Sequence, residues 1–140
     1  VMIILISRMK VHIVRQVTAA IIKKDGKYLI CQRSADDECG LLWEFPGGKL
    51  EEGETLEECI IREIKEELNL DIRVLDVFTT NVYHIFDKEV LFTVFNAEIV
   101  GGTMKLNEHN DARWVTLEEL PDYEFMPADI VFIEKLLNEK

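Results

Sequence analysis

Five charged residues recur at fixed intervals between Gly48 and Leu70, behind a short glycine turn. They are Glu54, Arg62, Glu63, Glu66 and Glu67. On a helix that advances about 100° per residue, Glu63 and Glu67 are surface neighbours and Glu66 lies on the same arc. Carboxylates at this spacing repel each other, and the helix dipole disfavours them further near a C-terminus. A hard divalent cation that takes oxygen ligands relieves this repulsion, so the pattern predicts a metal site for phosphate chemistry.

The helix that must carry these acids is predicted between a capping box and an asparagine. Thr55 and Glu58 form the T-x-x-E pattern of a capping box, and Asn69 suits a left-handed turn at the C-terminus. Between them, apolar residues recur four positions apart, as on the buried side of a helix. These apolar residues are Leu56, Ile60, Ile64 and Leu68.

An acidic helix face in an acidic protein is more often solvated than metal-binding. Here, however, we expect Glu58, Arg62 and Lys65 to occupy the side of the helix that faces water. The three acids of the candidate metal site would then border the core, where an unpaired charge is costly. The sequence therefore favours a metal site over a solvated face.

Composition and charge indicate a single acidic domain. The chain has 140 residues, enough for one domain with a sizeable core. Its net charge of −11 argues against a nucleic-acid-binding protein, which would carry a basic stripe. Cys31, Cys39 and Cys59 are odd in number and lack metal-type spacing, so we expect reduced thiols and a cytoplasmic location. The apolar run 1–6 is too short to span a membrane; it is either an extra edge strand or part of a leader before Met9.

Strand and helix signals predict a mixed α/β sandwich rather than alternating βαβ units. Asp87-Lys88 marks a hairpin turn, Gly101-Gly102 is expected to open a loop, and Thr116 with Glu119 forms a second capping box. The last helix is expected to face inward through Ile130, Ile133, Leu136 and Leu137. The predicted strands are 11–23, 27–33, 43–45, 71–86, 89–98 and 112–115, with a helical turn at 116–120 and a final helix at 127–138.

The segment from Gly48 to Leu70 resembles the Nudix box, the signature of the Nudix hydrolase family. The box reads G-x5-E-x7-R-E-U-x-E-E-x-G-U, where U is apolar, and this chain departs from it only at Asn69, in place of the second glycine. The segments 42–49, 32–33 and 127–129 are similar to those of the MutT-type, CTP pyrophosphohydrolase-like branch of the family.

This resemblance implies a fold, a reaction and a cofactor. We expect the Nudix-type α/β/α sandwich with a mixed β-sheet, in one domain at 9–140 behind an N-terminal extension at 1–8. The implied reaction is Mg²⁺-dependent hydrolysis of a nucleoside triphosphate to a monophosphate and pyrophosphate, in the service of nucleotide-pool sanitising. Mn²⁺ can substitute for Mg²⁺, and the number of metal ions stays open.

The resemblance also implies roles for the matched residues. The catalytic and metal-binding acids would be Glu63, Glu66, Glu67 and Glu108, with the carbonyl oxygen of Gly47 as a further metal ligand. Either Glu63 or Glu108 would take the proton of the attacking water. Gly48, Glu54 and Arg62 would be structural, with an ion pair between Glu54 and Arg62 that ties the turn to the helix.

The residues implied for substrate binding are Arg33, Glu44, Phe45, Pro46 and Asp129. Arg33 would contact the phosphates as a bidentate donor. Asp129 would read the base: a carboxylate accepts from an exocyclic amine, and a protonated carboxyl also donates. This suits a cytosine or an oxidised purine equally. The three histidines of the chain, His12, His84 and His109, form no cluster in the sequence.

Two other functions stay open at this point. One is a Nudix hydrolase of ADP-ribose, NADH or a dinucleotide, although no added recognition element is evident in this compact chain. The other is a silent Nudix domain that senses a nucleotide or binds a protein, but such domains commonly lose acids that this chain keeps. We expect a small nucleotide as the partner, with no nucleic acid or membrane, and either a monomer or a homodimer.

Overall fold

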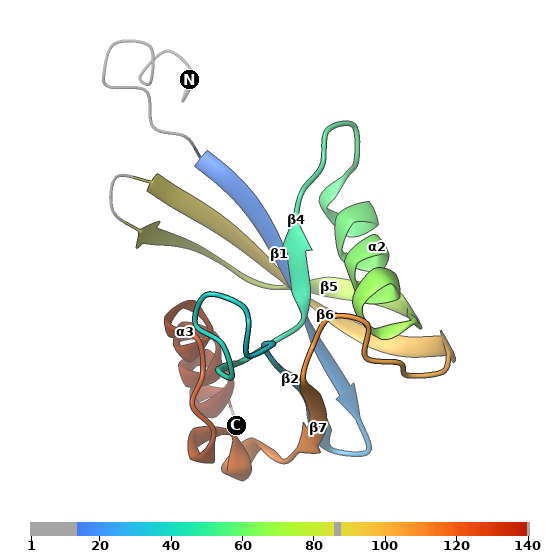
Figure 1. The fold of residues 1–140 in the computed structure, drawn as a ribbon, viewed down its shortest axis with the longest axis vertical. Helices are drawn as coiled ribbons and strands as arrows, with labels where there is room; N and C mark the ends of the chain where they lie inside the picture. The colour runs from blue at the N-terminus through green and yellow to red at the C-terminus, as the bar shows by residue number, and fades with distance from the viewer. Residues whose placement is uncertain (1–13, 86–87, 140) are drawn as a thin grey trace.

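The protein folds as a mixed β-sheet with a helix on each face, seen in a computed structural model that describes residues 14–85 and 88–139 (Figure 1). The strands are β1 (Val14–Lys24), β2 (Lys27–Gln32), β3 (Trp43–Glu44), β4 (Gly47–Lys49), β5 (Leu70–Ile85), β6 (Lys88–Gly102) and β7 (Asp111–Val115). The helical elements are α2 (Leu56–Leu68), the 3-10 helix η1 (Leu117–Asp122) and α3 (Pro127–Asn138). The apolar run at 1–6 and the extension at 1–8 lie outside the described residues.

The sheet runs in the order β3-β2-β1-β6-β5, with β4 paired to β1 and β7 paired to β2. Strands β1 and β6 are parallel, whereas the other strand pairs are antiparallel. This arrangement confirms the predicted mixed α/β architecture. Among the described residues, no helix is long and apolar enough to cross a lipid bilayer.

Strand β1 supplies side chains to two hydrophobic cores because successive residues of a strand point to opposite faces. Ala20 and Ile22 pack with the apolar side of α2. Ala19 and Ile21 pack with α3 and the aromatic residues around it. The α/β/α layering thus follows from a strand that is apolar on both sides, and it places β1 at the centre of the molecule.

Helix α2 begins and ends where the sequence predicts. Thr55 Oγ1 accepts a hydrogen bond from the Glu58 N–H, and the Glu58 side chain accepts one from the Thr55 N–H, which completes the capping box. At the other end, Asn69 adopts a left-handed conformation with φ 58° and ψ 31°. Its N–H donates to the Lys65 carbonyl, and its side-chain amide donates to the carbonyl of Thr103.

Two expectations about the end of β6 and the buried side of α3 are wrong. Gly101 and Gly102 do not open a loop; they extend β6 and pair with Asp71 and Leu70, because β5 starts immediately after the left-handed turn that ends α2. In α3, Ile130 does not face inward, since 46% of it is exposed, and Phe132 is fully buried in its place. The helix turns a slightly different side to the sheet, where Phe132 packs edge-on against Phe92 of β6.

The left-handed turn at Asn69 gives a test of how α2 is terminated. We expect Asn69→Ala to lower the free energy of unfolding by about 1–2 kcal/mol, because alanine disfavours positive φ. Asn69→Gly also loses the bond to Thr103 but adopts this conformation freely, so it should stay within about 1 kcal/mol of the wild type. Urea unfolding of the three proteins measures the difference, and equal midpoints for the alanine and glycine variants would contradict the argument.

Candidate active site

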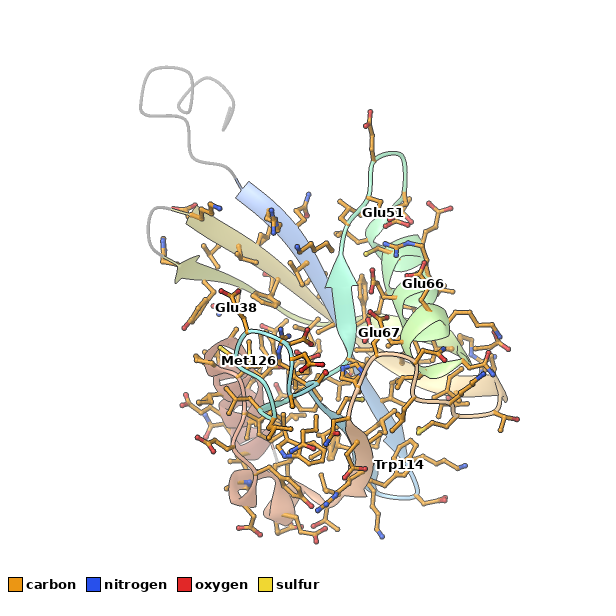
Figure 2. All side chains as sticks on the ribbon, viewed as in Figure 1. Glu38, Glu51, Glu66, Glu67, Trp114 and Met126 are labelled. Atoms are coloured by element: carbon orange, nitrogen blue, oxygen red, sulfur yellow. The ribbon has the colours of Figure 1, made fainter. Side chains whose placement is uncertain are left out.

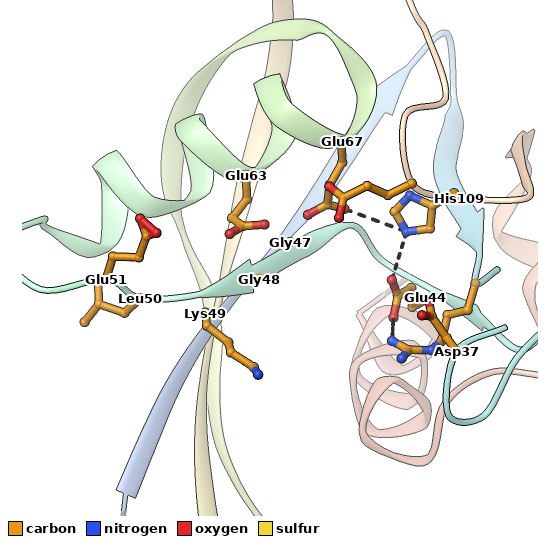
Figure 3. A pocket seen from close by; sticks show the side chains of 12 residues that line it. Asp37, Glu44, Gly47, Gly48, Lys49, Leu50, Glu51, Glu63, Glu67 and His109 are labelled. Carbon is orange, nitrogen blue, oxygen red and sulfur yellow. Dashed lines mark hydrogen bonds and ion pairs between the residues drawn. The ribbon is translucent and has the colours of Figure 1, made fainter.

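An acidic cleft of about 530 Å³ opens between α2, β4 and the loop that precedes β7 (Figure 3). Its lining combines carboxylates with the glycine backbone of β4 and basic side chains from β4 and the end of β2. The residues that line it are Arg33, Asp37, Glu44, Gly47, Gly48, Lys49, Leu50, Glu51, Glu63, Glu67, Glu108 and His109. The cleft therefore gathers residues that are up to 76 positions apart, from Arg33 to His109.

The first two residues of strand β4 are glycines, and they lie very close to β1 and to the Glu63 side chain of α2. A Cβ on Gly47 would lie 2.0 Å from the carbonyl oxygen of Thr18, and a Cβ on Gly48 would lie 2.2 Å from Oε2 of Glu63. At Gly47 the collision is with backbone, so this position requires glycine, whereas at Gly48 the end of the Glu63 side chain would have to turn away. The glycine pair brings main-chain oxygen atoms and the helix carboxylates to the same cleft.

Glu67 is the most deeply buried acid of the cleft, with 6% of its side chain exposed. Burial, followed by the hydrogen bond and the negative charge of the neighbouring Glu63, raises the pKa of its carboxyl to about 11. Without a counter-ion this carboxyl therefore keeps its proton at neutral pH. A cation between Glu63 and Glu67 would stabilise both ionised carboxylates and so offset the shift, which is why the donor set fits a hard divalent metal.

Glu66 lies differently from its two neighbours, and the expectation that it borders the core is wrong. Its side chain is 55% exposed and accepts a hydrogen bond from Nη1 of Arg62 at 3.2 Å. Figure 2 labels Glu66 and Glu67 on the same helix, where consecutive residues point in different directions. Among the described residues, no three acidic, histidine or cysteine side chains are already grouped to surround one metal ion.

The expected ion pair between Arg62 and Glu54 is present, but Arg62 does not extend into water as expected, because four carboxylates and a carbonyl hold it against the protein. It binds Glu54 through two hydrogen bonds, Nε to Oε2 at 3.0 Å and Nη2 to Oε1 at 2.7 Å. The same guanidinium donates to Glu63 at 2.8 Å and to the carbonyl of Lys49 at 3.1 Å. The hydrogen bond from Arg62 lowers the pKa of Glu54 to about 2. Arg62 thus joins the turn, the helix and β4.

The loop after β6 carries Glu108 and is anchored to the C-terminal end of α2. The last carbonyls of a helix have no partner within the helix. Here the side-chain amide of Asn107 donates to the main-chain carbonyl of Glu66 at 2.9 Å. The backbone N–H of Asn107 donates to the main-chain carbonyl of Glu67 at 3.0 Å. The Lys105 N–H donates to Leu68 in the same way. These bonds hold Glu108 in the cleft, where its charge contributes to the raised pKa of Glu67.

His109 is a member of the cleft that sequence reasoning missed. Its Nε2 lies 2.9 Å from Oε2 of Glu44 and 3.7 Å from Oε1 of Glu67. Glu44 in turn accepts a hydrogen bond from Nη1 of Arg33 at 3.0 Å. The spacing of the histidines in the sequence does not reveal this residue, because its partners, Glu44 and Glu67, are acids from distant segments. The available signal was its position beside Glu108.

A smaller cavity of about 220 Å³ adjoins the cleft on the α3 side and contains Asp129. Asp129 is 6% exposed, and its Oδ1 accepts a hydrogen bond from the Phe45 N–H at 3.0 Å. Burial raises the pKa of Asp129 to about 8, although the bond from Phe45 acts in the opposite direction. At neutral pH this carboxyl is therefore mainly protonated and can both donate and accept.

The other residues expected to bind substrate divide between the cavity and the core. Arg33 and Glu44 line both the cleft and the smaller cavity. Phe45 borders the cavity but is 3% exposed and packs against Phe125 in the core. Pro46 is fully buried and is not among the residues that line either space; its carbonyl accepts a hydrogen bond from the Ala20 N–H.

Among the proteins that are similar to this chain over most of its length are three enzymes. The CTP pyrophosphohydrolase of Escherichia coli K12 is 33% identical over 122 residues, which cover 87% of this chain and 90% of that protein. The 8-oxo-dGTP diphosphatase of the same strain is 30% identical, covering 86% and 95%. The ADP-ribose pyrophosphatase of Methanocaldococcus jannaschii is 36% identical, covering 79% and 67%.

The fold and a family model agree with these relatives. The solution structure of the Escherichia coli ORF135 protein superimposes with a TM-score of 0.83 at 30% identity, covering 93% of each chain. The model of the NUDIX domain matches residues 12–136, a span that includes the glycine pair, the acids of α2 and Asp129. With a match of this extent and relatives of similar length, the chain belongs to the Nudix family.

Proposed function

We propose that this protein is a Mg²⁺-dependent nucleoside triphosphate pyrophosphohydrolase that sanitises the nucleotide pool. It would convert a ribo- or deoxynucleoside triphosphate and water to the monophosphate and pyrophosphate. The observation that carries the proposal is the contact between the acidic cleft and the Asp129 cavity. Both are lined by Arg33, Glu44, Gly47, Gly48 and Lys49. We assign the triphosphate with its metal to the first space and the nucleoside to the second.

The metal would lie in the cleft beside α2. Nudix hydrolases generally use a divalent metal. We assign Glu63, Glu66, Glu67 and Glu108 as its acidic ligands, together with the carbonyl oxygen of Gly47. Glu63, Glu67, Glu108 and Gly47 already line the cleft, whereas Glu66 would have to turn from Arg62 toward the metal. Bound Mg²⁺ supplies positive charge that stabilises the transition state and lowers the pKa of the attacking water. Mn²⁺ can substitute because it takes the same carboxylate and carbonyl ligands.

The protein's own side chains would orient the substrate and move the proton. Arg33 and Lys49 line both spaces and would bind phosphate oxygens, Arg33 with the planar geometry of a guanidinium. Glu63 and Glu108 both line the cleft, so either of them can take the proton of water. Arg62, Glu54 and Gly48 would act structurally, since Arg62 holds Glu54 and Glu63 and Gly48 leaves room for the Glu63 carboxylate.

Asp129 would select the base. A buried carboxyl that both donates and accepts matches the edge of a cytosine or of an oxidised purine. The names of the relatives that act on CTP and 8-oxo-dGTP are consistent with these bases. The ADP-ribose pyrophosphatase relative favours one alternative, a hydrolase of ADP-ribose or a similar diphosphate. A cytoplasmic location, which agrees with three unpaired cysteines, and the choice between monomer and homodimer stay predictions.

A substrate survey tests the reaction. We expect the purified protein with Mg²⁺ to release pyrophosphate from CTP, dCTP or 8-oxo-dGTP faster than from the other canonical nucleoside triphosphates. Pyrophosphate and monophosphate should form in equal amounts, because one bond is cleaved. Cleavage of ADP-ribose without any release from triphosphates would overturn the substrate assignment and retain the metal site.

Replacement of Glu67 tests the metal site. We expect Glu67→Gln to abolish Mg²⁺-dependent turnover, with little loss of stability in the absence of metal, where the wild-type carboxyl is protonated. Mg²⁺ at about 100 times its dissociation constant should stabilise the wild type by roughly 2.7 kcal/mol, and the variant much less. Thermal unfolding with and without Mg²⁺ measures this. Glu57→Gln, an exposed acid of the same helix, is the control and should behave as wild type.

The raised pKa of Asp129 predicts how stability depends on pH. Between about pH 4 and 8 the folded protein holds a proton that the unfolded chain has lost, so this residue lowers stability as pH rises. Asp129→Asn keeps an acceptor for the Phe45 N–H and does not titrate. The variant's free energy of unfolding minus that of the wild type should therefore increase with pH up to about 8 and then stay constant. Urea unfolding from pH 5 to 9 measures this difference, and parallel curves would contradict it.

A further inference from the structure

His109 lies at the junction of the two halves of the candidate site. Its side chain is 6% exposed. Of its two ring nitrogens, only Nε2 has partners among the described residues. The partners are Glu44, from the end of β3, and Glu67, from α2 (Figure 3). The imidazole therefore stands between a carboxylate that lines both cavities and the most buried acid of the cleft.

Glu44 is held at both of its carboxylate oxygens. Arg33 donates to Oε1 at 3.0 Å, and Nε2 of His109 lies 2.9 Å from Oε2. A carboxylate that is bound at both oxygens has one orientation and little freedom to rotate. Because Arg33 and Glu44 line the cavity of Asp129 as well, the contacts form a chain from the nucleoside side to the acids of α2. This series of contacts runs in the order Arg33, Glu44, His109 and Glu67.

The second ring nitrogen of His109, Nδ1, is buried and has no hydrogen-bond partner among the described residues. An unpaired buried polar atom lowers stability. The ring's contact of hydrogen-bond length is thus that of Nε2 with Glu44 at 2.9 Å, and the same nitrogen lies 3.7 Å from Glu67. If both groups were ionised they would repel each other, and the charge of Glu44 is one cause of the raised pKa of Glu67.

The backbone of His109 is placed independently of its ring. The preceding Asn107 binds the carbonyls of Glu66 and Glu67, and the following Asn110 N–H donates to the Gln32 carbonyl at 2.9 Å. The loop is therefore fixed on both sides of His109. A substitution of the imidazole should change the carboxylates that it contacts without releasing the loop.

We propose that His109 is a positioning residue that sets Glu67 for metal binding and Glu44 for substrate binding at the same time. It acts through the two carboxylates and does not touch the substrate. This inference rests on the proposed function, because it assigns Glu67 to the metal and Glu44 to the nucleotide side. It predicts that a change at His109 alters Mg²⁺ binding and nucleotide turnover together.

Two substitutions by amide side chains distinguish a role for the contact at Nε2 from a role in which the His109 side chain only fills space. The amide nitrogen of glutamine reaches about the position of Nε2, whereas that of asparagine reaches about the position of Nδ1. We expect His109→Gln to keep kcat/KM and the Mg²⁺ concentration for half-maximal activity within about threefold of wild type. His109→Asn should lower kcat/KM at least about tenfold and raise that Mg²⁺ concentration by a similar factor. The rise of Tm on addition of Mg²⁺ without nucleotide should shrink in the asparagine variant only.

A double-mutant cycle with Glu44→Gln tests whether the effect passes through Glu44. We expect His109→Asn to change the Mg²⁺ response much less in the Glu44→Gln background than in the wild type. Independent effects of the two changes would overturn the proposal. The proposal would also be overturned if His109→Gln and His109→Asn lowered Tm equally and left the Mg²⁺ response unchanged. That is the result expected for a residue that only fills space.

The same measurements distinguish the failure of this inference from the failure of the proposed function. A wild type that cleaves no triphosphate but gains Tm with Mg²⁺ would overturn the function, and the Tm shifts of the variants would still test His109. If His109→Asn does not fold, Glu44→Gln alone breaks the chain of contacts at its centre. That variant should then reduce the Mg²⁺-dependent rise of Tm, and an unchanged rise would count against the proposal.

Discussion

The burial of Glu67 beside Glu63 is the constraint around which the site is arranged. Two carboxylates on one face of a helix cannot both stay ionised away from water without a counter-charge. Each of the two carboxyl groups has a basic side chain nearby: Arg62 binds Glu63, and His109 lies close to Glu67. None of these contacts neutralises Glu67, whose pKa is raised to about 11. The fold therefore maintains a local arrangement that is unfavourable by itself and that a divalent cation would relieve.

The glycine backbone of β4 determines how close the sheet can come to these acids. Side chains at Gly47 and Gly48 would collide with the Thr18 carbonyl and with the Glu63 carboxylate. The strand pairs with β1, which contributes alternate residues to the cores under α2 and α3. A single central strand thus sets both the layer spacing of the fold and the position of the backbone in the cleft.

Hydrogen bonds between distant segments complete the site. Two of the carbonyls that α2 leaves unpaired at its end accept hydrogen bonds from Asn107, which places the following Glu108 and His109 in the cleft beside the helix acids. On the other side, Asp129 at the start of α3 accepts from the backbone of Phe45 and closes the second cavity. The satisfaction of buried polar groups, required for stability in any case, is what assembles the cleft and the cavity.

By itself, the sequence determined the features that depend on neighbours in the chain: the capping box, the left-handed Asn69, the acids of α2, the mixed α/β class and the family. These are local because helix caps and periodicity involve residues within a few positions of each other. Only the tertiary structure decided that Arg62 turns inward, that Glu66 is exposed, and that Ile130 faces outward. It also decided the contact of His109 with Glu44, 65 positions away. A helical wheel gives the angle between side chains, but burial and partners depend on what the folded chain places opposite them.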